Sequence, residues 1–251
     1  MTFQKHYSVA DLRAVSARVG RRKGWDFSRM NTSHPATPWE YVSVVRGHLR
    51  PTDTVIDIGT GGGERLLELS SDARRLLGVD PDPEMIGRAR ELAADMGARS
   101  VRFETGTGAE ILDCFDVVID RHAPFEAKVV HRLLRPNGRF VTQQVGEHNM
   151  KNVRKAFQLE ANAVAPINPE MFIEAGLTVE RFDEYDVDYV VRDIDSLVFW
   201  LHALDLAHSD FVGFDSERDA DAINRLLSTS LTADGVVTNE HRYLLVAAKL
   251  S

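Results

Sequence analysis

An apolar run that breaks into a cluster of glycines is the feature of this 251-residue chain that most constrains its fold. Residues 55–58 read Val-Ile-Asp-Ile, and glycine then occupies positions 59, 61, 62 and 63. A second apolar run at residues 76–79 ends on Asp80. A buried strand, a glycine turn, a helix and a second strand tipped with a carboxylate is how an α/β fold holds an adenine nucleoside. The pattern therefore predicts a nucleoside site in which the carboxylate accepts hydrogen bonds from ribose hydroxyls.

The same alternation of strands and helices continues along the first part of the chain. Strands are predicted at residues 55–58, 76–79, 101–104, 115–120 and 139–145. Helices are predicted between them at residues 64–70, 82–96 and 126–134, with a turn at residues 136–138 before the fifth strand. Such an alternation implies a parallel sheet with right-handed crossovers.

The segments on either side of this region follow other patterns. Before it we expect a short helix at residues 8–19 and a helix at residues 37–49, in which Thr37 caps, Pro38 is the first helical residue and Glu40 completes a capping box. After Gly146 the predicted helices cover residues 152–164, 169–175, 194–206 and 219–228. The predicted strands there cover residues 178–191 and 242–248.

Composition limits the class of protein. Hydrophobic residues make up 43% of the chain and charged residues 27%, which is ordinary for a globular domain. The single cysteine, Cys114, excludes an internal disulfide and a four-cysteine zinc site, and no metal site is predicted. We expect a cytoplasmic protein with no membrane association, because the sequence has neither a signal-peptide pattern nor an apolar run of membrane-spanning length.

Charge is unevenly distributed. Residues 1–50 contain nine Lys or Arg and three Asp or Glu, a net +6, whereas the whole chain is −8. Residues 174–221 contain fourteen Asp or Glu and three Arg, a net −11. This segment is either a solvated acidic surface or a source of negative potential that favours a cationic substrate over nucleic acid.

The glycine spacing discriminates between cofactors. A dinucleotide-binding turn requires glycine at the first, third and sixth positions of its motif. Counting from Gly59, the sixth position is Glu64, and this counts against NAD because the sixth glycine permits close helix–strand packing. Asp80 does not discriminate, since both cofactor classes use an acid at that position.

Four segments, taken together, resemble the class I S-adenosylmethionine-dependent methyltransferases. They are residues 57–63, 78–85, 115–122 and 133–140, which occur in the family's order over roughly residues 40–146. The resemblance implies one domain over residues 1–251 with a doubly wound, Rossmann-like α/β fold. Its mostly parallel seven-stranded sheet would end in an antiparallel last strand. Residues 1–50 would form a helical lid, 51–150 the cofactor-binding core and 151–251 the substrate-side elements, with an insertion at 193–239.

The resemblance also implies which residues hold S-adenosyl-L-methionine and its product S-adenosyl-L-homocysteine. Asp57, Gly59 and Gly61 would line the methionine part, and Asp80 would hold the ribose. Met85 would lie against the adenine or serve only as a core methionine. The family often has an acid near residue 107 to accept the adenine amino group, so Thr107 or a backbone carbonyl must substitute here. The full predicted set is Asp57, Gly59, Thr60, Gly61, Asp80, Pro81, Met85, Thr107, Gly108 and Asp120.

Methyl transfer from a sulfonium is an in-line displacement, for which holding the reacting atoms in line supplies much of the rate. A general base is needed only if the acceptor must lose a proton. His122 and His148 follow the fourth and fifth strands and are the candidate catalytic bases, although each could instead hydrogen-bond only to neighbouring backbone. Residues 120–123 lack the (D/N)-P-P-(Y/F) tetrad of the amide-directed DNA methyltransferases.

These observations favour a methyltransferase that acts on oxygen or nitrogen of a small molecule. One alternative is an RNA methyltransferase, suggested by the basic residues Arg18, Arg21, Arg22 and Lys23. Another is a non-catalytic S-adenosylmethionine-binding protein, and a dehydrogenase comes last. Trp25 and Trp39 would either face the sulfonium through cation–π contact or pack a lid onto the core. The oligomeric state stays open.

Overall fold

The computed structural model describes residues 3–20, 27–159, 167–203 and 213–251, which form two compact units. We call them the sheet unit (Pro38–Val145, Ile167–Glu184 and Arg242–Ser251) and the helical unit (Met1–Thr37, Gly146–Pro166 and Tyr185–His241). The predicted division of one domain into lid, core and substrate-side parts stays a prediction.

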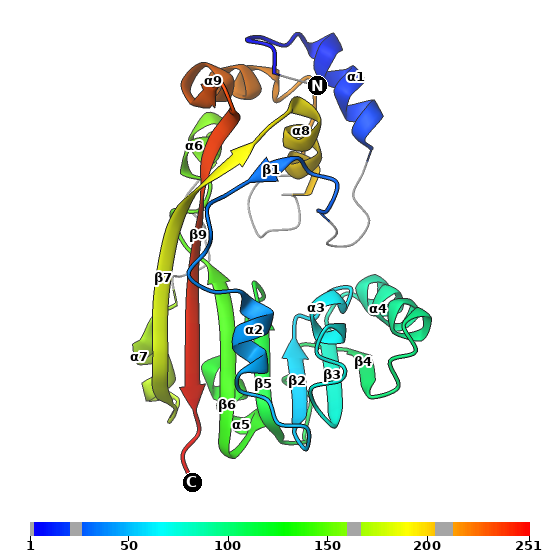
Figure 1. Ribbon diagram of the computed structural model, residues 1–251, viewed down its shortest axis with the longest axis vertical. Coiled ribbons are helices and arrows are strands. Elements are labelled where there is room, and N and C mark those ends of the chain that lie inside the picture. The colour runs from blue at the N-terminus through cyan, green and yellow to red at the C-terminus, as the bar shows by residue number, and fades with distance from the viewer. Residues whose placement is uncertain (1–2, 21–26, 160–166, 204–212) are drawn as a thin grey trace. The chain divides into compact units, whose positions relative to one another are not determined.

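The sheet unit contains seven strands of a nine-stranded sheet, in the order β7-β9-β6-β5-β2-β3-β4 (Figure 1). Strands β2, β3, β4, β5 and β6 pair in parallel, and β9 is antiparallel to β6. This arrangement confirms the predicted fold. The strands are β2 (Thr54–Ile58), β3 (Arg75–Asp80), β4 (Val101–Thr105), β5 (Phe115–Arg121), β6 (Leu134–Val145), β7 (Thr178–Val191) and β9 (Gly235–Ala248), of which β7 and β9 continue into the helical unit.

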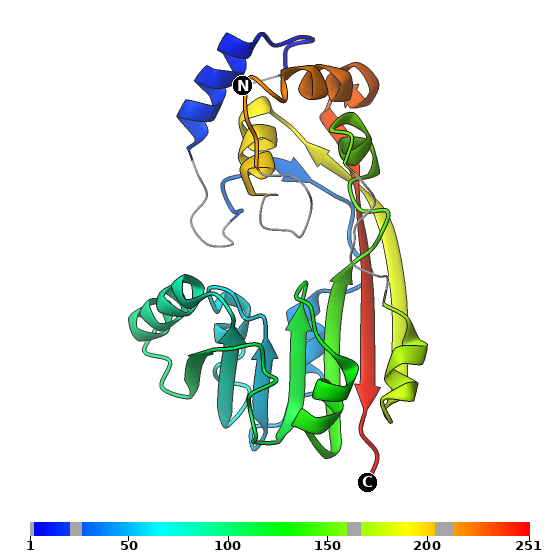
Figure 2. The ribbon, with the colours of Figure 1, turned by 180° about the vertical axis from the view of Figure 1, so that it is seen from behind.

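Helices cover both faces of this sheet. Figure 1 shows α2 in front of the sheet, and Figure 2, seen from behind, shows α5 in front. The face under α5 and α7 is apolar, with Val130, Leu133 and Phe172 packed against Ile56, Phe140 and other strand residues. The helices of this unit are α2 (Tyr41–Arg46), α3 (Glu64–Leu67), α4 (Pro83–Asp95), α5 (Ala127–Leu133) and α7 (Pro169–Glu174).

Two predicted boundaries differ, one because of a local helix cap and the other because of pairing between two strands. The helix predicted to start near Thr37 is α2, which begins at Tyr41, and Glu40 is its N-cap. The Glu40 carboxylate accepts hydrogen bonds from the backbone N–H groups of Val42 and Ser43, at 3.0 and 2.7 Å. Strand β6 starts at Leu134, before the predicted turn, because Leu134 already pairs with Phe115 across an irregularity in the ladder.

Helix α4 begins as predicted, and it contains Gly87 at a position where the structure does not require glycine. Asp82 caps the helix by accepting from the Glu84 N–H at 2.8 Å, and Pro83 follows it. Gly87 lies within this helix, and a Cβ added there would meet no heavy atom within 4 Å. We therefore expect Gly87→Ala to raise the free energy of unfolding by about 0.5–1 kcal/mol, through reduced backbone entropy of the unfolded chain. Urea unfolding measures this; a destabilised variant would contradict it.

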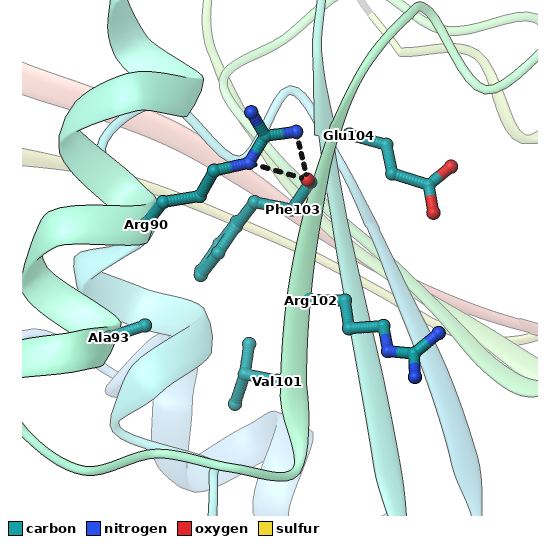
Figure 3. Close-up of a pocket in the computed structure, with 6 residues that line it drawn as sticks. All are labelled: Arg90, Ala93, Val101, Arg102, Phe103 and Glu104. Carbon is teal, nitrogen blue, oxygen red and sulfur yellow. Dashed lines mark hydrogen bonds between the residues drawn. The ribbon is translucent and has the colours of Figure 1, made fainter.

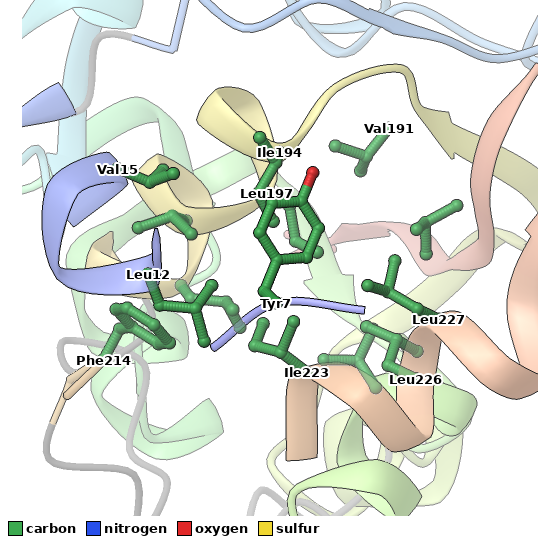
Figure 4. Packing of buried hydrophobic residues seen from close by; sticks show 14 of the residues in the cluster. Tyr7, Leu12, Val15, Val191, Ile194, Leu197, Phe214, Ile223, Leu226 and Leu227 are labelled. Atoms are coloured by element: carbon green, nitrogen blue, oxygen red, sulfur yellow. The ribbon is translucent and has the colours of Figure 1, made fainter. Parts of the chain in front are cut away.

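The helical unit is built from segments far apart in the sequence. It contains α1 (Val9–Val19), β1 (Thr32–Ser33), α6 (Lys151–Ala156), α8 (Ile194–Ala203), α9 (Ala220–Ser230) and β8 (Leu231–Thr232). Helix α1 starts with a capping box between Ser8 and Asp11, close to the predicted start. Figure 4 shows its apolar core, in which Leu12 and Val15 of α1 pack with Ile194 and Leu197 of α8 and with Ile223 and other residues of α9.

Some predictions for this unit were incomplete. Strands β1 and β8 were not predicted, and β9 begins seven residues before the predicted residue 242 because Gly235 and Val236 pair with β8. The helix predicted at 152–164 is shorter and ends at Ala156, and the helix predicted at 194–206 is described from Ile194 to Ala203. Residues 160–164 and 204–206, together with Arg21, Arg22, Lys23 and Trp25, lie outside the described residues. No helix among the described residues is long and apolar enough to cross a membrane.

Candidate functional site

The predicted glycine turn follows β2 and requires its glycines. Gly59 and Gly61 have φ angles of +69° and +56°, in the left-handed region that disfavours other residues. A Cβ added to Gly59 would lie 2.1 Å from the Cβ of Ala123, which follows β5. The turn therefore passes so close to the end of β5 that no side chain fits between them.

Asp80 ties this turn to the end of β3. Its Oδ2 accepts a hydrogen bond from the Gly61 N–H at 2.9 Å, and its Oδ1 accepts one from the Asp82 N–H at 2.9 Å. Thr60 adds a backbone bond from its N–H to the Val79 carbonyl at 2.9 Å. A carboxylate has about four acceptor positions, so the half-buried Asp80 can hold the turn and still accept from ligand hydroxyls.

Two further predicted acids, Asp57 and Asp120, are buried on adjacent strands. Asp57 of β2 is 5% exposed and Asp120 of β5 is fully buried, and Asp120 pairs in register with Ile58. Burial raises the pKa of Asp57 to about 7. Burial, and then the charge of Asp57, hold the pKa of Asp120 well above its usual range. Both carboxyl groups thus retain protons far more readily than surface acids do.

Among the described residues, only one of the two carboxylate oxygens of Asp120 accepts hydrogen bonds. Its Oδ1 accepts from the Gln144 side-chain N–H at 2.5 Å, whereas its buried Oδ2 has no hydrogen-bond partner in the part of the chain that the structure describes. A buried polar atom left without a partner is costly and marks a place that a ligand or water can satisfy. The residues present therefore fit a polar, positively charged ligand beside the glycine turn.

The buried acid Asp57 predicts a pH dependence of stability. Its pKa is raised from an unfolded value near 3.9 to about 7, so the folded state binds the additional proton between these values. The free energy of unfolding should fall as pH rises through this window, by at most about 1.4 kcal/mol per pH unit, and level off above it. Asp57→Asn should remove the contribution of Asp57 to this pH dependence of the free energy of unfolding. Urea unfolding from about pH 5 to about pH 8 tests this; a constant difference between wild type and variant would contradict it.

The predicted adenine end of the site contains an acid that the sequence interpretation missed. Thr107 is exposed, and both its N–H and its hydroxyl donate to the Glu110 carboxylate at 3.1 Å. Gly108 is buried, with φ +86°, and an added Cβ would lie 3.5 Å from Ile58. An acid therefore does lie next to Thr107, because Glu110 follows three residues later, and the Thr-x-x-Glu spacing was the available signal.

The remaining predicted cofactor residues follow β3. Pro81 is exposed, and Met85 is half-buried in the first turn of α4. Within the described part of the chain, neither side chain makes a polar contact that would assign it a role. Their predicted positions against the ribose and the adenine stay predictions.

His122 lies directly after β5 in a strained backbone conformation. Its φ is +64°, and its backbone N–H donates to the Gln143 carbonyl of β6 at 3.0 Å. Its ring Nε2 lies 3.0 Å from the side-chain nitrogen of Gln143. Burial, and then the charges of Arg121, Arg242 and Arg65, hold its pKa well below the usual range. A non-glycine residue held at positive φ at the end of a parallel strand is typical of a functional site.

Aromatic residues support this end of the sheet. Trp39 is 7% exposed and donates from Nε1 to the Gln143 Oε1 at 2.8 Å. The hydroxyl of Tyr41 donates to the Asp120 carbonyl at 3.0 Å. Trp39 therefore packs within the sheet unit, and its predicted alternatives, contact with the sulfonium or packing of a lid, stay predictions.

The second predicted base, His148, belongs to the helical unit. Its backbone N–H donates to His241 Nδ1 at 3.1 Å, and the two rings stack with centroids 5.3 Å apart. Its side chain is 65% exposed. The sheet unit therefore brings together the predicted residues at the ends of β2, β3 and β5, and His148 is not among them.

Sequence patterns missed Gln143 and Gln144, which contact His122 and Asp120. Three consecutive polar residues, Thr142 to Gln144, follow Phe140 and Val141 in the buried part of β6, and all three are buried themselves. Polar side chains at such positions need partners, so this run was the available signal.

A hollow of about 390 Å³ lies apart from these residues, between α4 and β4 (Figure 3). Arg90 crosses it and donates two hydrogen bonds to the Phe103 carbonyl, at 3.1 and 2.7 Å. None of the predicted site residues lines it, so it is not a candidate for the nucleoside site.

Part of this chain is similar in sequence to proteins that are named as methyltransferases. The chain is 32% identical to the uncharacterized methyltransferase YcgJ of Bacillus subtilis over 102 residues, covering 37% of this chain and 40% of that protein. It is 33% identical to an arsenite methyltransferase of Halobacterium salinarum over 111 residues, covering 39% and 28%. The chain thus matches less than half the length of these relatives.

A solved structure extends the likeness in fold. The crystal structure of the Bacillus subtilis YcgJ protein superposes with a TM-score of 0.62, covering 84% of this chain and 98% of that one, at 18% identity. A family model described as a methyltransferase domain matches residues 49–191, more than half of the chain. With the glycine turn, Asp80 and the sheet order already established, the chain belongs to the methyltransferase domain family of the class I S-adenosylmethionine-dependent methyltransferases.

Proposed function

We propose that the protein uses S-adenosyl-L-methionine to methylate an oxygen or nitrogen atom of a small molecule. The observation that carries this proposal is the glycine turn held by Asp80 beside two buried acids, Asp57 and Asp120. This arrangement supports a ligand that combines ribose hydroxyls with positive charge. NAD carries its positive charge on a pyridinium nitrogen without an N–H, so unlike the ammonium group of S-adenosyl-L-methionine it cannot donate a hydrogen bond from that charge to the acids.

Each residue has a separate task in this proposal. Asp80 accepts hydrogen bonds from the ribose, and the bare backbone at Gly59 and Gly61 admits the methionine part. Asp57 and Asp120 face its positive charge with carboxyl groups. When bound, S-adenosyl-L-methionine supplies a methyl group that its positive sulfur has already activated. The protein contributes mainly by orienting the acceptor, an effect of up to about 7–11 kcal/mol on the barrier.

Charge and ion pairing favour a small molecule over RNA. Arg18, the main basic residue of the RNA alternative within the described part, donates to both carboxylate oxygens of Asp195, at 3.0 and 2.5 Å. Arg29 donates to the Val19 carbonyl and lies 4.3 Å from the centre of the Phe199 ring. These cations are engaged within the helical unit, so fewer are available to bind phosphates. The net −11 of residues 174–221 adds repulsion, and it supports a cationic acceptor.

Calorimetry with S-adenosyl-L-methionine, S-adenosyl-L-homocysteine and NAD tests the cofactor. We expect the first two to bind and NAD to bind far more weakly; tighter NAD binding would overturn the proposal.

Production of S-adenosyl-L-homocysteine with amines, phenols, carboxylic acids, arsenite and bulk RNA then tests the acceptor. Turnover with RNA that falls steeply with added salt would replace the small-molecule assignment, because phosphate contacts release counterions. Tight cofactor binding without an open acceptor cavity in a cofactor-bound crystal structure would support the non-catalytic alternative.

A further inference from the structure

Three hydrogen-bonded side chains in the sheet unit, those of Trp39, Gln143 and His122, determine the protonation of His122. Trp39 Nε1 lies 2.8 Å from Gln143 Oε1, and Gln143 Nε2 lies 3.0 Å from His122 Nε2. Gln143 is 5% exposed and pairs, through β6, with the end of β5 directly before His122. The three groups therefore lie at the carboxyl ends of the strands, where this fold binds its ligands.

The hydrogen-bond donors and acceptors of these three side chains can be arranged in only one way. An indole N–H donates and never accepts, so the Gln143 atom facing Trp39 must be the amide oxygen. The amide nitrogen then faces His122, and since it only donates, His122 Nε2 must be an unprotonated acceptor. In a neutral imidazole the one proton is consequently on Nδ1.

Charges around His122 maintain this neutral form. The pKa of the imidazole is lowered by burial and by Arg121, Arg242 and Arg65. The backbone bond from His122 to Gln143 fixes the ring beside the amide at a φ of +64°. Nδ1 has no hydrogen-bond partner within the described residues, so its N–H is available to a ligand.

We propose that Trp39 and Gln143 are positioning residues that hold His122 as its neutral Nδ1–H tautomer, so that His122 donates a hydrogen bond to a carboxylate or carbonyl oxygen of a ligand. This inference rests on the proposed function and replaces, within it, the expected role of His122 as a base. The three neighbouring arginines favour an anionic oxygen at this position. That oxygen belongs either to the methionine part of the cofactor or to the methyl acceptor.

Nitrogen NMR of the full chain tests the tautomer directly. Long-range ¹H–¹⁵N spectra of uniformly labelled protein distinguish a protonated from an unprotonated ring nitrogen, and loss of one signal set in His122→Asn assigns the residue. At neutral pH we expect a protonated Nδ1 and an unprotonated Nε2. A protonated Nε2, in either the other tautomer or the imidazolium, would overturn the proposal.

Two substitutions alter these hydrogen bonds and leave His122 itself in place. Gln143→Glu places an anionic acceptor against Nε2, and should raise the pKa of His122 by about 1–3 and protonate Nε2. Trp39→Phe removes the indole donor, frees the Gln143 amide to turn, and should make the Nε2–H tautomer appear. Trp200→Phe makes the same replacement in α8, where Trp200 contacts Tyr189, and should leave the His122 signals unchanged. Wild-type His122 signals in both folded variants, Gln143→Glu and Trp39→Phe, would exclude a positioning role.

Three probes identify the source of the oxygen. S-adenosyl-L-homocysteine contains the carboxylate, 5′-methylthioadenosine lacks it, and acetate is a carboxylate alone. A shift of the Nδ1 proton with the first but not the second assigns the oxygen to the cofactor. A shift only when acetate is added to the S-adenosyl-L-homocysteine complex assigns it to the methyl acceptor. No shift with any probe would overturn the donor role. A protein that has the Nδ1–H tautomer but fails to bind S-adenosyl-L-methionine would instead contradict only the proposed function.

Discussion

Gly59→Ala is expected to abolish binding of S-adenosyl-L-methionine and to destabilise the fold. The new Cβ would lie 2.1 Å from the Ala123 Cβ, a distance at which atoms cannot coexist, so the turn after β2 must move away from β5. Overpacking of this kind costs about 1–3 kcal/mol. The left-handed backbone at φ +69° costs about 1–2 kcal/mol more for a residue with a Cβ.

A matched control separates these two costs. Gly97 has a φ of +64°, and a Cβ added there would meet nothing within 4 Å. Gly97→Ala should therefore show the backbone cost alone and bind the cofactor normally. Urea unfolding gives the stabilities, and calorimetry gives the affinities. If Gly59→Ala bound S-adenosyl-L-methionine like wild type, the turn would not be the cofactor site.

Asp80→Asn is expected to weaken S-adenosyl-L-methionine binding by about 10- to 100-fold, because hydrogen bonds to a charged group are worth about 1.5–3 kcal/mol. Two effects combine in this loss. The amide accepts from hydroxyls less strongly than a carboxylate does. It also places an NH₂ group where one of two backbone donors, Gly61 N–H or Asp82 N–H, needs an acceptor.

Glu84→Gln is the control for the loss of one negative charge near this turn. Glu84 is exposed in the first turn of α4 and pairs with Arg88 of the same helix. Surface pairs of this kind contribute little, so both affinity and stability should stay near wild type. Calorimetry with S-adenosyl-L-homocysteine measures both variants. Equal affinities in Asp80→Asn and Glu84→Gln would exclude Asp80 from the site.

The fold was predictable because its signals are local. The buried strand ending at Ile58, the carboxylate at Asp80 and the cap at Asp82 each depend on residues a few positions apart. The start of β6 differs because Leu134 joins Phe115 of another strand, a pairing that no local pattern reveals. The early start of β9 is different, because Thr232 and Gly235 pair in a tight hairpin, a local signal that the sequence interpretation missed.

The site was predictable in its cofactor half and less so around the acceptor. Glycine and aspartate at fixed spacing identify Gly59, Gly61 and Asp80 because the turn needs those residues for its own geometry. The role of His122 depends on Gln143 and on Trp39, which lie 21 and 104 residues from their partners in this chain of hydrogen bonds. A histidine in sequence indicates only that a titratable ring is present, whereas the tautomer is a property of its neighbours.

The sheet order also has a consequence for biosynthesis. Strand β9 lies between β6 and β7, yet its residues 242–248 leave the ribosome after every other strand described in the sheet unit. Until then β6 exposes an unpaired edge, and β7 has no neighbour on that side. Exposed edges of this kind readily pair with other chains. The nascent polypeptide is therefore most vulnerable to aggregation during the interval in which residues 185–241 are being translated, and chaperone binding in that interval would protect it.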